Sequence, residues 1–330
     1  MFNKLLINLT EKILEDDSFR ISYVEACLLA ALREDETIDL IMCANKIRQK
    51  FKQNRVVNCS ITNAKSGCCT EDCAFCAQSS YHETDIPAHA LLSEERLVDD
   101  AVSLYNNGAT EFSMVTSGYE LTDAEMATIG RAANQIKEQT GLMICSSLGV
   151  LTESRARQLK ESGVSAYHHN LETARSFFDQ VCTTHPYEDD VETVKIAKAA
   201  GLKVCCGGIF GLGESWEQRI ELAITLRDLD VDSIPINFLN PIAGTRMADR
   251  PLLSPMEALK CISLFRLINP RKDITICGGR EVTLRDLQSW IFAAGANGML
   301  VGNYLTTRGR DIKTDREMIK DLGFIAEKGV

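Results

Sequence analysis

The chain has 330 residues, 45% hydrophobic and 25% charged, which is enough to bury one barrel-sized core or two ordinary domains. Its net charge of −10 leaves no basic surplus for neutralising phosphates, so nucleic acid is excluded as the main partner. No apolar run of about 18 residues occurs and no signal-peptide pattern is present, so we expect no membrane span. Thirteen cysteines in a chain expected to be cytoplasmic indicate metal ligands and buried thiols rather than disulfides.

The first 54 residues are expected to be helical. Ser22 and Glu25 form a capping-box pattern ahead of Ala26, and residues 40–51 carry an amphipathic repeat. We therefore expect residues 1–54 to form an N-terminal helical cap and residues 55–330 to form the main domain.

From residue 55 onward, short β-rich runs alternate with helical stretches that usually end near a glycine. The expected strands are 56–61, 111–115, 142–146, 164–170, 202–206, 233–238, 273–277 and 298–301. Helices are expected over 94–107, 189–200 and 283–295, and after starts near 122, 152, 215, 254 and 315. Eight such repeats predict an α/β protein with a parallel (β/α)₈ TIM-type barrel, and a doubly wound sheet is the weaker alternative.

Three cysteines follow the first expected strand at C-x₃-C-x₂-C spacing. These loop thiols are Cys69, Cys73 and Cys76. Three thiolates from one short loop suit a cubane iron–sulfur cluster and leave one iron open for a further ligand. A zinc loop is the alternative, but a second cysteine pair of the kind that structural zinc sites use does not follow. Phe75, just before the third cysteine, matches the pattern typical of radical S-adenosylmethionine (SAM) enzymes.

Polar and glycine-rich segments occur at the ends of other expected strands, where a barrel places its chemistry. Residues 207–213 form a glycine-rich turn that could also lie against a flat adenine. His168 and His169 are adjacent on a strand and therefore point to opposite faces, which argues against a shared metal ion. Asn170 and Asn237 could donate and accept hydrogen bonds toward an amide-like ligand.

With these motifs in order, the chain resembles the biotin synthase family over about residues 40–310. The resemblance implies a radical SAM barrel, usually a homodimer, that inserts sulfur into dethiobiotin to make biotin. It implies a [4Fe–4S] cluster on the loop thiols, SAM bound to its open iron, and a flavodoxin- or ferredoxin-type electron donor.

The resemblance also assigns ligand contacts to matching positions. SAM contacts would come from Phe75, Asn170, Glu172, Ile209 and Gly211. Dethiobiotin contacts would come from Asn170 and Asn237 for the ureido ring and from Thr306 and Thr307 for the carboxylate tail.

The chain departs from the family where a second cluster is expected. Better-known members hold a [2Fe–2S] cluster inside the barrel with three cysteines and an arginine. Here Ser113 stands at the second-strand cysteine position and Thr275 at the arginine position. Glu111 and Asp190 replace two further arginines that are usual in the family.

Four cysteines on the first, third, fifth and seventh expected strands could replace that ligand set. These interior thiols are Cys59, Cys145, Cys205 and Cys277. Alternate strands of a barrel contribute one layer of inward side chains, so we expect the four to converge and hold an auxiliary cluster, four-iron rather than [2Fe–2S]. The alternative is that these cysteines pack in the core as small hydrophobic residues, and this alternative is strongest for Cys277. The remaining thiols expected to be structural are Cys27, Cys43, Cys68, Cys182 and Cys261.

Two other functions compete with sulfur insertion. Another radical SAM lyase or maturase on the same barrel is the nearer rival, and interior cysteines discriminate because a lyase needs no sacrificial sulfur. An iron–sulfur electron carrier is disfavoured, because a carrier needs neither an open iron nor a polar substrate pocket.

Overall fold

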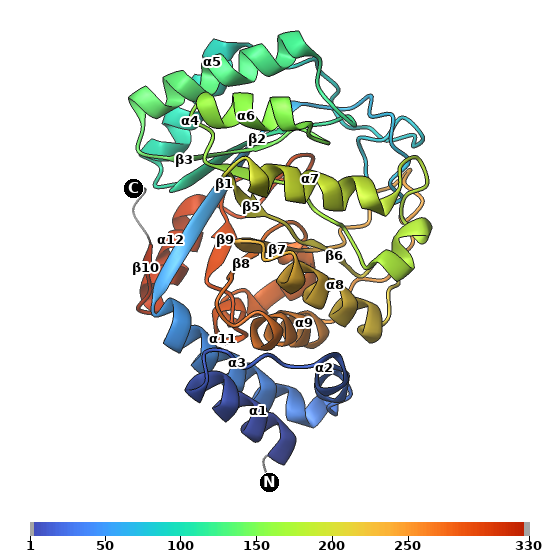
Figure 1. Cartoon of the computed structure of the whole chain (residues 1–330), viewed down its shortest axis with the longest axis vertical. Helices are drawn as coiled ribbons and strands as arrows, with labels where there is room; N and C mark the ends of the chain where they lie inside the picture. The colour runs from blue at the N-terminus through green and yellow to red at the C-terminus, as the bar shows by residue number, and fades with distance from the viewer. Residues whose placement is uncertain (1–2, 327–330) are drawn as a thin grey trace.

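Strand β1 (Arg55–Lys65) closes a parallel barrel, because it pairs with β2 (Glu111–Thr116) on one side and β9 (Gly298–Leu300) on the other. The computed structural model describes residues 3–326. Between those two neighbours, the ring continues through β3 (Met143–Ser147), β4 (Ala166–His168), β5 (Lys203–Cys205), β7 (Ser233–Phe238) and β8 (Asp273–Ile276). The predicted (β/α)₈ barrel is confirmed (Figure 1).

Two short strands add to the ring. Strand β6 (Gly208–Phe210) pairs with β7, and β10 (Ile325–Ala326) pairs with the first residues of β1. A Cβ atom on Gly207 would lie 1.9 Å from the Pro235 carbonyl oxygen, and one on Gly208 would lie 2.4 Å from that of Glu172. Because they lack side chains, the two glycines allow three backbone segments to approach one another closely. From the sequence alone, this stretch could be predicted only as a turn.

The outer helices begin at the expected polar residues. Ser93, Thr122, Thr152, Ser215 and Ser254 each accept a backbone hydrogen bond as N-caps, and Thr122 forms the expected capping box with Glu125. The helices are α4 (Glu94–Asn106), α5 (Asp123–Gln139), α6 (Glu153–Glu161), α7 (Tyr187–Ala199), α8 (Trp216–Asp228), α9 (Pro255–Ile268) and α12 (Ile312–Asp321).

The prediction of a single helix over residues 283–295 is wrong. The segment forms α10 (Arg280–Leu284), a 3₁₀ turn η3 (Arg285–Leu287) and α11 (Trp290–Ala293). Arg285 has a left-handed φ of 49°, which ends α10. Buried Arg280 lies 2.7 Å from the Asp315 carboxylate of α12, so this broken segment ties the last helix to the barrel.

At one end of the molecule, α2 (Tyr23–Ala30) and α3 (Thr37–Lys52) pack against the outer helices α8 and α9, and α1 (Lys4–Glu15) packs on α3 (Figure 1). The Ser22–Glu25 capping box is present. Lys52 pairs with Asp273 at 2.7 Å, at the start of β8. These helices therefore lie near the amino-terminal ends of the strands and leave the carboxyl ends free. Within residues 3–326, no helix is long and apolar enough to cross a membrane.

Candidate active site

A cavity of about 430 Å³ lies where the cysteine loop meets the interior and carboxyl ends of the barrel strands. The predicted site residues on its wall are Cys59, Cys69, Cys73, Phe75, Cys76, Asn170, Glu172, Cys205, Ile209, Asn237, Cys277, Thr306 and Thr307. Cys145 is buried outside the wall, and Gly211 is also outside it and donates its N–H to Glu214 at 2.9 Å.

The cysteine loop begins with a sharp reversal after β1. Gly67 and Cys68 have left-handed φ values of 74° and 51°, and a Cβ on Gly67 would lie 2.7 Å from the Cβ of Ala88. The Cys69 N–H donates to Gln78 at 3.0 Å, and the Cys76 N–H donates to Cys73 at 2.9 Å. These bonds fold the loop onto itself, and the loop thiols all face the cavity.

Asp72 fastens the loop to the segment that follows β4. Its carboxylate accepts hydrogen bonds from the Thr183 N–H at 2.8 Å and the Thr183 hydroxyl at 2.7 Å, and Arg246 lies 3.5 Å away. Burial opposes ionisation, but the Thr183 hydrogen bonds, with support from Arg246, hold the pKa of Asp72 well below its usual range. Phe75 packs against a small apolar cluster that includes Val181, which anchors the other side of the loop.

The loop thiols suit a metal cluster. A hydrogen bond with Cys182, then burial, raises the pKa of Cys73, and burial raises that of Cys76 to about 11. Cys73 and Cys76 therefore favour the protonated form when no metal is bound, and metal binding would displace those protons. Three convergent thiols on one loop match the donor set of an iron–sulfur cluster.

The interior thiols lie on inward-facing positions of β1, β3, β5 and just beyond β8. Burial raises the pKa of Cys59 well above its usual value, and the charges of Glu111 and the other three interior thiols raise it further. Cys59, Cys205 and Cys277 line the same cavity, and buried Cys145 lies close enough to influence the pKa of Cys59 and Cys205. Ser113, opposite Cys145 in the sheet register, has a buried hydroxyl oxygen without a hydrogen-bond partner among residues 3–326. A thiol-rich interior with an unpaired polar oxygen fits an iron–sulfur occupant better than apolar packing does.

The polar residues after β4 form a connected network. Asn170 Oδ1 accepts from His168 at 3.0 Å and from the Gly207 N–H at 3.2 Å, while Asn170 Nδ2 donates to Glu172 at 3.3 Å. His169 instead pairs with Asp190 at 2.8 Å. The two histidines therefore have different hydrogen-bond partners, although both residues line the cavity rather than opposite faces. Burial raises the pKa of Glu172 to about 8 and lowers that of His168 to about 4.

Asn237 and the two threonines also line the cavity. Asn237 donates to the Gly208 carbonyl at 3.3 Å and accepts from the Gly278 N–H at 2.9 Å. Each asparagine amide retains further hydrogen-bonding capacity beyond these contacts. The loop of Thr306 and Thr307 is held by Asn63, which donates to the Leu305 carbonyl at 3.0 Å.

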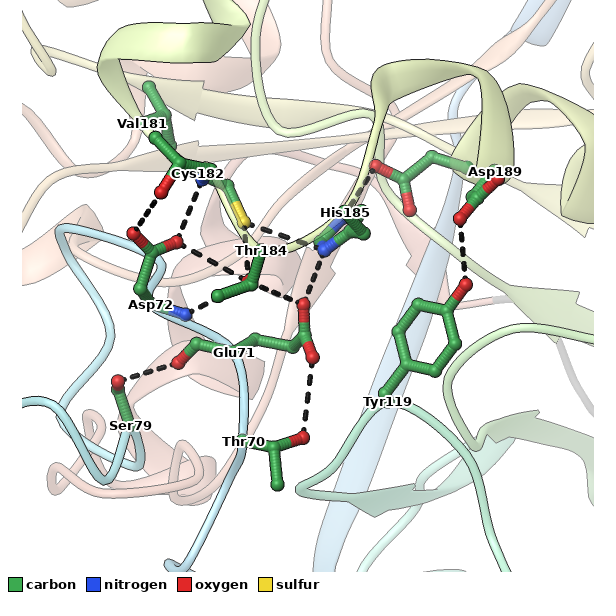
Figure 2. A network of polar contacts seen from close by, with 12 residues as sticks. Thr70, Glu71, Asp72, Ser79, Tyr119, Val181, Cys182, Thr184, His185 and Asp189 are labelled. Carbon is green, nitrogen blue, oxygen red and sulfur yellow. Dashed lines mark hydrogen bonds and ion pairs between the residues drawn. The ribbon is translucent and has the colours of Figure 1, made fainter.

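The structure adds a group of residues that sequence reasoning did not select. Cys182, expected to be structural, lines the cavity with Glu71 and His185 (Figure 2). A hydrogen bond from Cys73, then one from His185, lowers the pKa of Cys182 to about 4 despite burial. Burial opposes protonation of His185, but Asp190 and Cys182 raise its pKa to about 11. The C-x₂-H spacing of Cys182 and His185 was the available signal.

Family models match most of the chain. The Radical SAM superfamily model matches residues 64–226, and the Biotin and Thiamin Synthesis associated domain matches residues 235–325.

Solved structures share the whole architecture at low sequence identity. Methylornithine synthase superposes with a TM-score of 0.83 at 21% identity, covering 97% of this chain and 98% of its own. The FeFe-hydrogenase maturase HydG from Carboxydothermus hydrogenoformans superposes with a TM-score of 0.81 at 19% identity, covering 98% of this chain and 79% of its own. These likenesses support the fold alone.

Relatives in sequence are much closer. The biotin synthase of Syntrophus aciditrophicus (strain SB) is 61% identical over 312 residues, covering 94% of this chain and 96% of that protein. The biotin synthase of Nitratidesulfovibrio vulgaris (strain DSM 19637 / Miyazaki F) is 53% identical over 308 residues, covering 91% and 85%. The chain therefore belongs to the biotin synthase family of radical SAM enzymes, which insert sulfur into dethiobiotin using a [4Fe–4S] cluster, SAM and an auxiliary iron–sulfur cluster.

Proposed function

We propose that sulfur insertion in this chain uses the loop thiols to hold the [4Fe–4S] cluster and the interior thiols to hold the auxiliary cluster. The observation that carries this proposal is a single cavity lined by all three loop thiols and by Cys59, Cys205 and Cys277. When bound, the loop cluster supplies reductive cleavage of SAM, and the auxiliary cluster supplies the sulfur. A substrate held in this cavity would lie within reach of both.

We infer that the auxiliary cluster has four irons. Four thiols surround the interior, whereas the positions usual for a third cysteine and an arginine carry Ser113 and Thr275. A [4Fe–4S]-type cluster takes four thiolate ligands. Inclusion of Cys277 is supported by its effect on the pKa of both Cys59 and Cys205.

The chain's own residues would orient both small molecules. Phe75 and Ile209 offer apolar surface to the adenosyl part of SAM, and Gly211 shapes the turn that carries Ile209. Glu172 is placed to accept from ribose hydroxyls, with Asn170 donating to its carboxylate. Asn170 would also meet dethiobiotin.

The remaining dethiobiotin contacts would come from Asn237 and the two threonines, which line the same cavity. Asn237 would meet the ureido ring together with Asn170. The hydroxyls of Thr306 and Thr307 would receive the carboxylate tail, because hydroxyl donors suit an anionic oxygen.

The rival expectation, another radical SAM lyase or maturase on the same barrel, has no support from the sequence relatives, which are biotin synthases. The interior thiols favour sulfur insertion, since a lyase has no use for a source of sulfur inside its barrel.

We also propose a homodimer, an external electron donor and a cytoplasmic location. Apolar side chains on α2 and α3 are exposed, with Val24 at 67% and Leu28 at 53%, which supports an interface. SAM cleavage requires an electron that a flavodoxin- or ferredoxin-type protein could supply. Reduced thiols in both sets favour a reducing compartment. The division into a cap (1–54) and a barrel (55–330) is likewise our proposal, supported by the packing of α1 on α3 and of α2 and α3 on the outer helices α8 and α9.

The cluster assignment is tested by anaerobic iron and sulfide analysis with electron paramagnetic resonance, with and without SAM. Two four-iron sites predict about eight irons per chain and a signal from one cluster that changes when SAM binds. About six irons per chain would indicate that a two-iron interior site persists with substitute ligands. Absence of any SAM-dependent change would contradict the assignment of the loop thiols.

A further inference from the structure

Three different metal-ligating side chains converge beside the cysteine loop. His185 Nδ1 lies 2.5 Å from Glu71 Oε2 and 3.4 Å from Cys182 Sγ, and the three ligand atoms all lie within 4.8 Å of one another (Figure 2). In a tetrahedral zinc site these ligand types are about 3.3–3.6 Å apart. The Glu71–His185 distance is therefore about 1 Å shorter than a metal site needs, whereas the His185–Cys182 distance already matches it.

A second carboxylate orients the imidazole from its other side. Asp190 Oδ2 lies 3.4 Å from His185 Nε2, and Asp190 Oδ1 is held by His169 at 2.8 Å. Histidines that bind metals almost always donate their second ring N–H to such a group, which fixes the ring and its tautomer. Thr184 donates to Glu71 Oε2 at 2.6 Å and orients that carboxylate as well.

The cluster is accessible from the active-site cavity. All three residues line the cavity wall, and the side chains of His185 and Glu71 are 12% and 13% exposed. Asp189 lies on the same side (Figure 2), and Asp190, in contact with His185, adds a second negative charge. A cation could therefore enter from the cavity and would offset the surrounding carboxylates.

We propose that Glu71, Cys182 and His185 bind one divalent cation of the borderline class, Zn²⁺ or Fe²⁺, beside the loop cluster, whose ligand Cys73 contacts Cys182, but with ligands that neither iron–sulfur cluster uses. A thiolate with an imidazole selects such ions over Mg²⁺ or Ca²⁺, which prefer oxygen ligands. Glu71 lies between Cys69 and Cys73 in the chain, so the ion would fasten the cysteine loop to residues 182–185.

The test uses the holoenzyme with both clusters assembled, so that the other thiol sites are occupied. Co²⁺ is titrated into this protein by equilibrium dialysis, and its thiolate-to-cobalt absorption is recorded. We expect one Co²⁺ per chain beyond the cluster iron. Cys182→Ala should abolish the charge-transfer band, and Cys182→Ala and His185→Gln should each weaken binding by more than about 100-fold. Displacement by Zn²⁺ or by Fe²⁺ then identifies the preferred ion.

Two further variants make the result specific. Asp190→Asn should weaken Co²⁺ binding by about 10–100-fold while the band remains, because it removes only the group behind His185. Cys68→Ala removes an exposed thiol of the same loop and should change nothing. Iron content and SAM cleavage, measured on the same samples, separate a failure of the clusters from a failure of this site. No extra Co²⁺ in the wild type, or an unchanged band in Cys182→Ala, would show that the three residues form a hydrogen-bonded network only.

Discussion

The loop thiols and three of the four interior thiols line the same cavity, but the two sets are brought together in different ways. The loop thiols lie within eight residues, and hydrogen bonds inside the loop set their arrangement. The interior thiols extend from Cys59 to Cys277, and only closure of the barrel brings them together. The loop can therefore be identified from spacing alone, whereas the interior set depends on which face of each strand points inward.

The two sets of thiols also differ in the contacts that fix their positions. The loop is fastened by Asp72 to Thr183 and Arg246, more than a hundred residues away. The interior thiols stand on paired strands whose register is fixed over the whole ring, as Cys59 opposite Glu111 and Cys145 opposite Ser113 illustrate. We therefore expect single substitutions to separate the functions of the two sets cleanly.

The largest effect is expected from Cys73→Ala. Removing one of three loop thiols leaves too few ligands for the cluster that binds SAM, so 5′-deoxyadenosine formation should fall by about three orders of magnitude or more, each worth roughly 1.4 kcal/mol. The product is measured by liquid chromatography under strong reductant. Cys68→Ala on the same loop is the matched control, and undiminished product in Cys73→Ala would refute the radical SAM role of this loop.

Cys59→Ser should disrupt the cluster held by the interior thiols. Iron should fall from about eight toward about four per chain, because one thiolate of the interior set is lost. Biotin formation should stop while 5′-deoxyadenosine is still produced at the loop. Cys206→Ala, a buried thiol next to Cys205 in the chain, serves as the control. Full biotin formation in Cys59→Ser would mean that the interior thiols are packing residues.

Several features of this molecule could be predicted from sequence because they are local. The C-x₃-C-x₂-C spacing, the Thr122–Glu125 capping box and the alternation of strands and helices depend on near neighbours in the chain. The break at Arg285 was missed, because a left-handed residue other than glycine carries no clear pattern and Arg280 was not expected to pair with Asp315. Contact between Glu71 and His185 could not be foreseen either, since 114 residues separate them.

Substrate contacts should give a smaller effect than either cluster. Asn237→Ala leaves the Gly278 N–H and the Gly208 carbonyl without their side-chain partner and removes a proposed contact to the ureido ring. Losing the contact should weaken dethiobiotin binding by about 1–3 kcal/mol, or roughly 5- to 150-fold. Asn170→Ala should behave similarly. Binding is measured calorimetrically in the presence of SAM, with cluster iron as the check on folding. Unchanged affinity in both variants would remove the asparagines from the substrate site.

The smallest expected effect is a pH dependence of SAM binding at Glu172. Burial, then the charge of Asp190, raises the pKa of this carboxyl to about 8, so it is largely neutral below that pH and ionised above it. An ionised carboxylate accepts hydrogen bonds more strongly than a neutral acid does. SAM should therefore bind about fivefold more tightly as pH rises through about 8, a gain of roughly 1 kcal/mol. Equilibrium binding across this range checks the slope.

Glu172→Gln should flatten the profile, because an amide of similar shape does not titrate here. Glu138→Gln changes an exposed carboxylate on α5 and should leave the slope intact. The same slope in Glu172→Gln would assign the titration to another group and remove Glu172 from the ribose contact. If the pH dependence of SAM binding is lost only in Glu172→Gln, then an ionising group that contacts SAM lies just after β4, on the cavity wall that both thiol sets share.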